Sequence, residues 1–221
     1  MSIKAVIFDM DGVLIDSEPL WFKVETRIYR KLGFSLSPSM YDETIGMRYD
    51  QVVRHWFKKF PWENFPVEAV QKLIIEKVKK IINKEGKLNP GAKNLLHFLK
   101  KENVKIGLAS SSPKQIINTV LKKLIIKQYF RPILSGEFES HPKPHPDIFL
   151  SAAKKLKVKP KECLVIEDSV FGVTAAKKAS MKCVALVKNT SAATRRKYQA
   201  DYYLTNLADF DRHFWLEINQ C

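Results

Sequence analysis

The chain has 221 residues, and 45% of them are hydrophobic, so it can bury a full core and intrinsic disorder is excluded as the default. No apolar run approaches the roughly eighteen residues of a membrane span, which argues against a membrane protein. Lysine and arginine number 38 against 23 acidic residues, a net charge of +15. The lysines are scattered as pairs without interleaved aromatic residues, so we expect no specific nucleic-acid binding.

The first predicted element is a strand over Lys4–Phe8. The apolar run that contains it is cut by Asp9 and Asp11. It is too short for a secretory signal and lacks a small-residue cleavage site. We therefore expect a cytoplasmic protein, and we expect a monomer.

Residues 17–84 show helical patterns and no convincing strand. We interpret this stretch as a helical domain inserted just after the first strand. The predicted domains are then a core of residues 1–16 and 85–221 and a cap of residues 17–84, joined by hinges near Asp16 and Gly86. A cleft between two domains is a natural place for a substrate.

From residue 85 onward, short β-branched runs alternate with amphipathic stretches, which is the pattern of βαβ units and a parallel sheet. The predicted strands are Lys105–Ala109, Pro132–Leu134, Leu164–Ile166, Cys183–Val187 and Tyr202–Leu204. The predicted helices cover residues 91–102, 113–124, 146–157, 169–180 and 206–217. The sequence therefore predicts an α/β fold with a doubly wound parallel sheet.

Two carboxylates and a glycine, Asp9, Asp11 and Gly12, follow the first strand directly. Side chains two apart in a strand point the same way, so both acids can face one ligand at the carboxyl edge of the sheet. Their mutual repulsion would be relieved by a divalent cation. An ionised Asp9 is a competent nucleophile toward phosphorus.

A second acidic pair, Glu167 and Asp168, ends the apolar run 163–166. Carboxylate-rich sites favour Mg²⁺ over zinc. Ser169, the next residue, is equally well explained as the N-cap of a helix.

Two further segments offer groups for an anion. Ser110 and Ser111 follow a predicted strand, and a hydroxyl there can join backbone N–H groups at a helix start. Lys143, between two prolines, can neutralise a phosphoryl oxygen. His141 and His145 flank this lysine, but with no cysteine or third histidine nearby we expect no metal site there.

The order of these motifs resembles that of the haloacid dehalogenase superfamily: D-x-D-G-V at Asp9, a strand-end serine at Ser110, K-P-x-P at Lys143 and E-D-S at Glu167. Within it, the run D-S-E-P-L-W from residue 16 resembles the sugar and sugar-alcohol phosphatases of the β-phosphoglucomutase-like branch. The resemblance implies a Rossmann-like core with a small helical cap. It also implies a Mg²⁺-dependent phosphatase acting on a small phosphorylated metabolite.

By this resemblance, Asp9 is the nucleophile and Asp11 is the acid and base. Asp9, the Asp11 carbonyl and Asp168 would hold Mg²⁺, with Glu167 a direct or water-mediated partner. Ser110, Ser111 and Lys143 would grip the phosphoryl group.

Three cap residues are candidate substrate contacts: Glu18 and Trp21 after the first hinge, and Arg48 in the run G-M-R. Trp21 can equally be part of the cap core, and Arg48 a surface ion pair. The alternative enzyme is a phosphosugar mutase on the same scaffold. Relatives with that activity resemble one another in a hinge histidine, where this chain has Trp21, and in a lysine where it has Pro113.

Overall fold

The computed structural model describes residues 2–220. Within this range six parallel strands form one sheet in the order β3-β2-β1-β4-β5-β6. The strands are β1 (Ala5–Phe8), β2 (Lys105–Ser110), β3 (Ile133–Ser135), β4 (Cys163–Glu167), β5 (Lys182–Leu186) and β6 (Tyr202–Leu204). The predicted α/β fold with a parallel sheet is confirmed.

The helices fall into two groups. Those of residues 18–85 are α1 (Glu18–Lys31), α2 (Pro38–Asp42), α3 (Tyr49–Lys59) and α4 (Val67–Glu85). Those that follow are α5 (Ala92–Lys101), α6 (Lys114–Lys123), α7 (Asp147–Leu156), α8 (Val170–Lys178), α9 (Ala192–Tyr198) and α10 (Arg212–Gln220). Short 3₁₀ turns cover Lys127–Tyr129, Gly136–Phe138, Pro160–Glu162 and Leu207–Asp209. In the described part of the chain, none of the helices has the length and apolar character that crossing a membrane requires.

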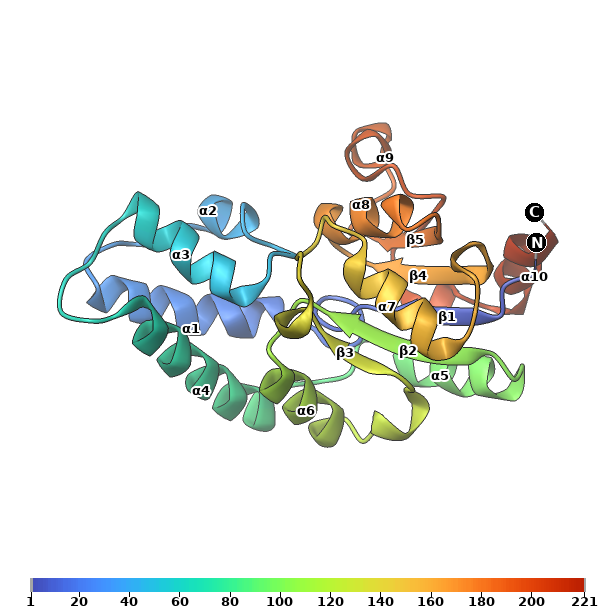
Figure 1. The fold of residues 1–221 in the computed structure, drawn as a ribbon, viewed down its shortest axis with the longest axis horizontal. Helices are drawn as coiled ribbons and strands as arrows, with labels where there is room; N and C mark the ends of the chain where they lie inside the picture. The colour runs from blue at the N-terminus through green and yellow to red at the C-terminus, as the bar shows by residue number, and fades with distance from the viewer. Residues whose placement is uncertain (1, 221) are drawn as a thin grey trace.

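The sheet is covered on both faces, as Figure 1 shows. On β1, Val6 and Phe8 pack into the core cluster that includes α5, α6 and α10. Ala5 and Ile7 point to the other face and pack with α7 and α8. Because both faces are buried, the strand is apolar throughout instead of alternating with polar residues.

Two details of the C-terminal region differ from the prediction. The prediction of a single helix over residues 206–217 is wrong, because a 3₁₀ turn, Leu207–Asp209, precedes a separate α10. Asp211 accepts a hydrogen bond from the backbone N–H of Phe214, so a new helix starts there. The sequence did not indicate α9, because α9 buries none of its residues and so has no apolar stripe.

Helices α1–α4 lie together at one end of the molecule, on the left in Figure 1. Aromatic side chains fill much of the space between them, including Tyr29, Phe34 and Trp56. At the junction with the sheet, the amide of Asn89 donates to the carbonyls of Gly12 and Val13. We refer to residues 17–84 as the cap, although its status as a separate domain stays a prediction.

Candidate active site

The candidate site lies where three adjacent strands end. β1 pairs with β2 on one side and with β4 on the other. The residues at or just after these strand ends, Asp9, Ser110 and Glu167, therefore come together at one edge of the sheet. They line a single cavity whose other side is formed by the cap. Other candidates from the sequence that line it are Asp11, Glu18, Trp21, Ser111, Lys143 and Asp168.

Lys143 is the central cation of this cavity, and only 4% of its surface is exposed. Its Nζ lies 2.7 Å from Asp9 Oδ1 and 2.6 Å from Glu167 Oε1. It also donates to the carbonyl of Ala109 at 3.2 Å. Burial alone would lower the pKa of Lys143, but the two carboxylates raise it above its usual value. Lys143 is therefore charged and held directly beside Asp9.

Asp9 is buried, with 6% of its surface exposed. Burial raises the pKa of Asp9 to about 7; Lys143 acts in the opposite direction, whereas the charges of Glu167 and Asp11 add to the rise. The sequence alone suggested that Asp9 would be ionised at neutral pH with an ordinary pKa. In the folded protein, Lys143 does not fully offset the burial of this carboxyl, so a further cation would favour its ionised form.

Glu167 uses both of its carboxylate oxygens within the protein. Oε1 pairs with Lys143, and Oε2 accepts 2.9 Å hydrogen bonds from the backbone N–H groups of Asp168 and Ser169 and from the Ser169 hydroxyl. The Ser169 hydroxyl also accepts from Gly172 N, so it is the N-cap of α8. Glu167 thus fixes both the lysine and the turn that carries Asp168.

Asp168 has a different environment from Glu167. Burial, followed by the charges of Glu167 and Asp9, raises the pKa of Asp168 well above its ordinary value. No side chain among residues 2–220 forms a salt bridge with it. At Gly12, whose φ is +70°, an added Cβ would lie 1.8 Å from Asp168 Oδ2, so only glycine leaves room for this carboxylate.

Two carboxylates, the buried Asp9 and the partly buried Asp168, thus share one cavity, and Lys143 contacts only the first of them. This donor set fits a small divalent cation with oxygen ligands. It does not fit zinc in a structural site, because no histidine or cysteine of residues 2–220 lines the cavity. The residues present are therefore compatible with the predicted Mg²⁺ site.

Asp11 is held by hydroxyl groups and by the cap. Its Oδ1 accepts from the Ser17 hydroxyl and, at 3.3 Å, from Trp21 Nε1. Its Oδ2 accepts from the hydroxyl of Ser112 at 2.7 Å and from that of Ser110 at 3.4 Å. Ser17 and Ser112 were not among the candidates, although both lie in runs that the sequence singled out.

Ser111 and Arg48 connect the cap to the sheet. The Ser111 hydroxyl donates to the carbonyl of Gly46 at 3.0 Å. Arg48 pairs with Asp50 and donates to the carbonyl of Glu139 at 3.1 Å, and it lines a separate hollow instead of the main cavity. The role of Arg48 as a substrate clamp stays a prediction.

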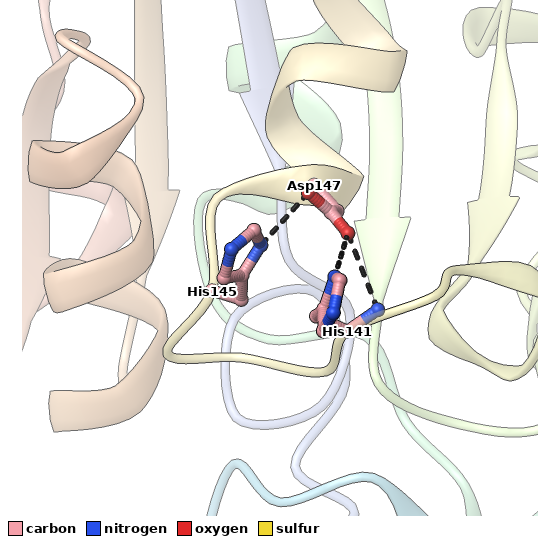
Figure 2. Close-up of side chains that lie close together, drawn as sticks. All are labelled: His141, His145 and Asp147. Atoms are coloured by element: carbon pink, nitrogen blue, oxygen red, sulfur yellow. Dashed lines mark hydrogen bonds and ion pairs between the residues drawn. The ribbon is translucent and has the colours of Figure 1, made fainter.

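Three side chains outside the cavity link the two ends of the loop that carries Lys143, as Figure 2 shows. Asp147, at the start of α7, lies 2.9 Å from His141 Nδ1 and 2.7 Å from His145 Nδ1. Asp147 also accepts from the backbone N–H of His141. Both histidines are exposed, and both are already engaged by one carboxylate, so we interpret the cluster as a brace for the loop around Lys143.

The cap side of the cavity contains residues that the sequence did not single out. Glu25 lines it from α1, and Tyr41 and Tyr49 line it from the segments that follow. The signal for Glu25 was present in the sequence: an acidic residue lies on the apolar stripe of α1 with Trp21 and Ile28.

The comparisons with known proteins agree with this geometry. The sequence model of a family described as haloacid dehalogenase-like hydrolase matches residues 6–186. The chain belongs to this family. It is therefore an enzyme of the haloacid dehalogenase-like class, as the resemblance indicated.

Three relatives place the chain within the haloacid dehalogenase-like hydrolases. Hexitol phosphatase B of Escherichia coli (strain K12) is 34% identical to this chain, and the match covers 94% of each of the two chains. A phosphorylated carbohydrates phosphatase of Thermotoga maritima is 32% identical, and the match covers 81% of this chain and 83% of that protein. The crystal structure of β-phosphoglucomutase from Clostridium difficile superposes with a TM-score of 0.84 at 27% identity, covering 99% of this chain and 97% of that one. The predicted β-phosphoglucomutase-like branch is confirmed.

Proposed function

We propose that the protein is a Mg²⁺-dependent phosphatase that hydrolyses the monophosphate of a sugar or sugar alcohol through an aspartyl-phosphate on Asp9. One observation carries the proposal: a buried lysine lies 2.7 Å from the Asp9 carboxylate, in the cavity that also contains Asp11. The two phosphatases named above support the substrate class. We keep the cytoplasmic location and the monomeric state as predictions.

In the first step, an Asp9 oxygen attacks phosphorus and the bond to the ester oxygen breaks. Lys143 Nζ, already beside Asp9, neutralises an oxygen of the transferring group, and the Ser110 hydroxyl donates to another. Protonated Asp11 gives its proton to the departing alcohol oxygen. The alcohol leaves, and Asp9 carries the phosphoryl group.

In the second step, Asp11, now ionised, takes a proton from a water molecule that attacks the phosphorus of the aspartyl-phosphate. The bond between Asp9 and phosphorus breaks, releasing inorganic phosphate and restoring Asp9. The hydroxyls of Ser17 and Ser112 fix the orientation of Asp11 in both steps. Trp21 adds a contact from the cap, so cap position and acid-base geometry are coupled.

Asp9, Asp168 and the backbone carbonyl of Asp11 are the groups that would hold Mg²⁺. When bound, the ion would shield the negative charge of the phosphoryl group. Glu167 has no oxygen to spare while it pairs with Lys143 and caps the turn at Asp168. We therefore propose that Glu167 supports the site from behind and contacts the ion at most through water.

Removal of divalent cations should abolish turnover, because Asp9 and Asp168 share the cavity and the one lysine there pairs with Asp9 and Glu167 but not with Asp168. The measurement is phosphate release in excess chelator, followed by titration with Mg²⁺. Asp168→Asn should raise the Mg²⁺ concentration for half-maximal activity at least about tenfold. Full activity in the presence of excess chelator would contradict the metal requirement.

The cavity favours a substrate with one phosphate. We use the name cap wall for the cavity-lining residues between positions 18 and 52. This wall contains Glu18 and Glu25 but no lysine or arginine. A mutase must hold a second phosphate at the far end of its substrate, and a charged contact of that kind contributes about 1.5 to 3 kcal/mol. Water, not a second sugar phosphate, is then the expected acceptor.

The test of the proposed function is phosphate release across a panel of sugar, polyol and nucleoside monophosphates. We expect sugar or polyol phosphates to give the highest kcat/KM. A parallel assay supplies β-glucose 1-phosphate with a trace of the 1,6-bisphosphate and follows glucose 6-phosphate and free phosphate. Isomerisation that outruns phosphate release would overturn the assignment in favour of the mutase.

A further inference from the structure

The proposed mechanism uses neither of the two acidic residues of the cap wall, Glu18 and Glu25, and Glu25 is the more deeply buried of the two. It lies on α1, where Glu18, Trp21 and Glu25 are spaced three and four residues apart and so share one helix face. All three line the cavity. The indole of Trp21 contacts the acid-base residue Asp11, and Glu25 lies one helical turn farther into the cap.

The carboxyl of Glu25 is buried without the partners that such a group normally has. Only 2% of the residue is exposed. Its Oε2 makes no well-formed hydrogen bond among residues 2–220, and neither does the hydroxyl of Tyr49, although the two groups lie close enough to influence each other's pKa. Tyr49 lines the same cavity and packs on Trp21 with ring centroids 4.7 Å apart. Two buried polar groups that lack a well-formed hydrogen bond therefore lie side by side on the cap side of the cavity.

Such an arrangement destabilises the free protein. A buried polar atom without a partner keeps the desolvation penalty and gains no hydrogen bond in return. An isolated acid at this position of α1 would therefore be unfavourable unless another molecule completes its hydrogen bonds. Perturbed acids in a cleft are candidates for a functional role on the same physical ground.

We propose that Glu25, together with Tyr49, forms a recognition subsite for a hydroxyl group at the non-phosphorylated end of the substrate. The inference rests on the proposed phosphatase function and extends it to specificity. Lys143 and Ser110, which would hold the phosphoryl group, line the cavity from the sheet, and Glu25 and Tyr49 line it from the cap. Glu25 is thus a specificity residue that binds substrate away from the reacting atoms.

The charge state of the pair selects a neutral ligand group. Burial raises the pKa of Glu25 to about 8, with the Tyr49 hydroxyl acting in the opposite direction. Near neutral pH the carboxyl is then mostly protonated, so it offers one donor and one acceptor, and an alcohol hydroxyl needs both. A second phosphate or a carboxylate would find acidic residues and no cation in the cap wall. The structure thus selects polyhydroxylated monophosphates over bisphosphates and phosphorylated acids.

The experiment compares two substrates that differ only in their hydroxyls, sorbitol 6-phosphate and n-hexyl phosphate. The readout is the ratio of their kcat/KM values for each protein. Glu25→Leu should lower this ratio about 10- to 100-fold, because the substrate hydroxyl loses its partner. Glu25→Gln keeps a donor and an acceptor and should lower it less than about fivefold. Tyr49→Phe should give an intermediate loss.

Thermal unfolding separates recognition from a structural role. Glu25→Leu removes an unpaired buried acid, so we expect the melting temperature of the free protein to rise while the ratio falls. The matched control is Thr26→Val, the next residue of α1, which also has a buried hydroxyl without a partner but does not line the cavity. Its ratio should equal that of the wild type.

Two outcomes would overturn the subsite. One is an unchanged ratio in Glu25→Leu. The other is an equal loss on both substrates with a lower melting temperature, which would make Glu25 a structural residue. The proposed function has a separate readout in the wild type, which must hydrolyse sorbitol 6-phosphate or another sugar or polyol phosphate. If the wild type hydrolyses none of them, the phosphatase assignment fails, and the subsite fails with it.

Discussion

Asp9→Asn should lower kcat by at least about 10³-fold on any phosphate ester while leaving the fold intact. The amide is nearly isosteric with the carboxylate but cannot attack phosphorus, and uncatalysed ester hydrolysis is too slow to replace it. Lys143 keeps its ion pair with Glu167 in this variant, so no buried charge is left without a partner. Steady-state phosphate release and thermal unfolding are the two measurements. Activity above a few per cent of the wild type would exclude Asp9 as the nucleophile.

Two variants serve as controls for Asp9→Asn. Asp209→Asn makes the same chemical change at an exposed position outside the cavity and should keep full activity. Asp11→Asn should still transfer phosphate from an activated aryl ester to Asp9, because a good leaving group needs no proton. Its second step should be slow, so we expect a burst of aryl alcohol followed by slow release of phosphate.

Lys143→Met should reduce both stability and activity. The substitution leaves the carboxylates of Asp9 and Glu167 buried beside each other without their shared cation. Removing one partner from a buried ion pair costs about 3–5 kcal/mol, which chemical denaturation in chelator can measure. Because the lysine would also neutralise the transferring group, kcat/KM should fall at least about 10²-fold.

The matched control for Lys143→Met is Lys4→Met. Lys4 also forms a lysine–glutamate pair, with Glu162, but its side chain is 60% exposed. An exposed pair of this kind contributes about 1 kcal/mol or less, so this variant should be close to the wild type in stability and activity. Equal losses of stability in the two variants would show that burial does not make the ion pairs of Lys143 more stabilising than the exposed pair of Lys4.

The fold and the central part of the site could be predicted from local patterns. The run Ala5–Phe8 followed by Asp9 is a fully buried strand that ends in an acid, and the run ending at Glu167 repeats the pattern. Parallel strands place their carboxyl ends at one edge, so these acids were expected at the same edge of the sheet. Family membership, read from four short motifs in order, follows from the same local information.

The partners of each side chain could not be predicted in this way. The sequence indicated Glu167 as a possible ion ligand, whereas the fold directs both of its oxygens to Lys143 and to the turn at Asp168. Arg48, a candidate substrate clamp, contacts Asp50 and the carbonyl of Glu139, and the sequence did not indicate either contact. Competition between several acceptors for one donor depends on distances of a few tenths of an ångström, which residue spacing does not contain.

Sequence alone therefore determined the α/β class, the helical stretch after the first strand and the acids at the strand ends, because each depends on the order of neighbouring residues. Tertiary structure decided which groups are buried together across long separations. Ser112 reaches Asp11 across 101 positions, and Lys143 reaches Asp9 across 134. It also decided that Glu25 lines the cavity with no well-formed hydrogen bond to Oε2 from residues 2–220, and burial by the packing of α1 against its neighbours raises the pKa of that acid to about 8.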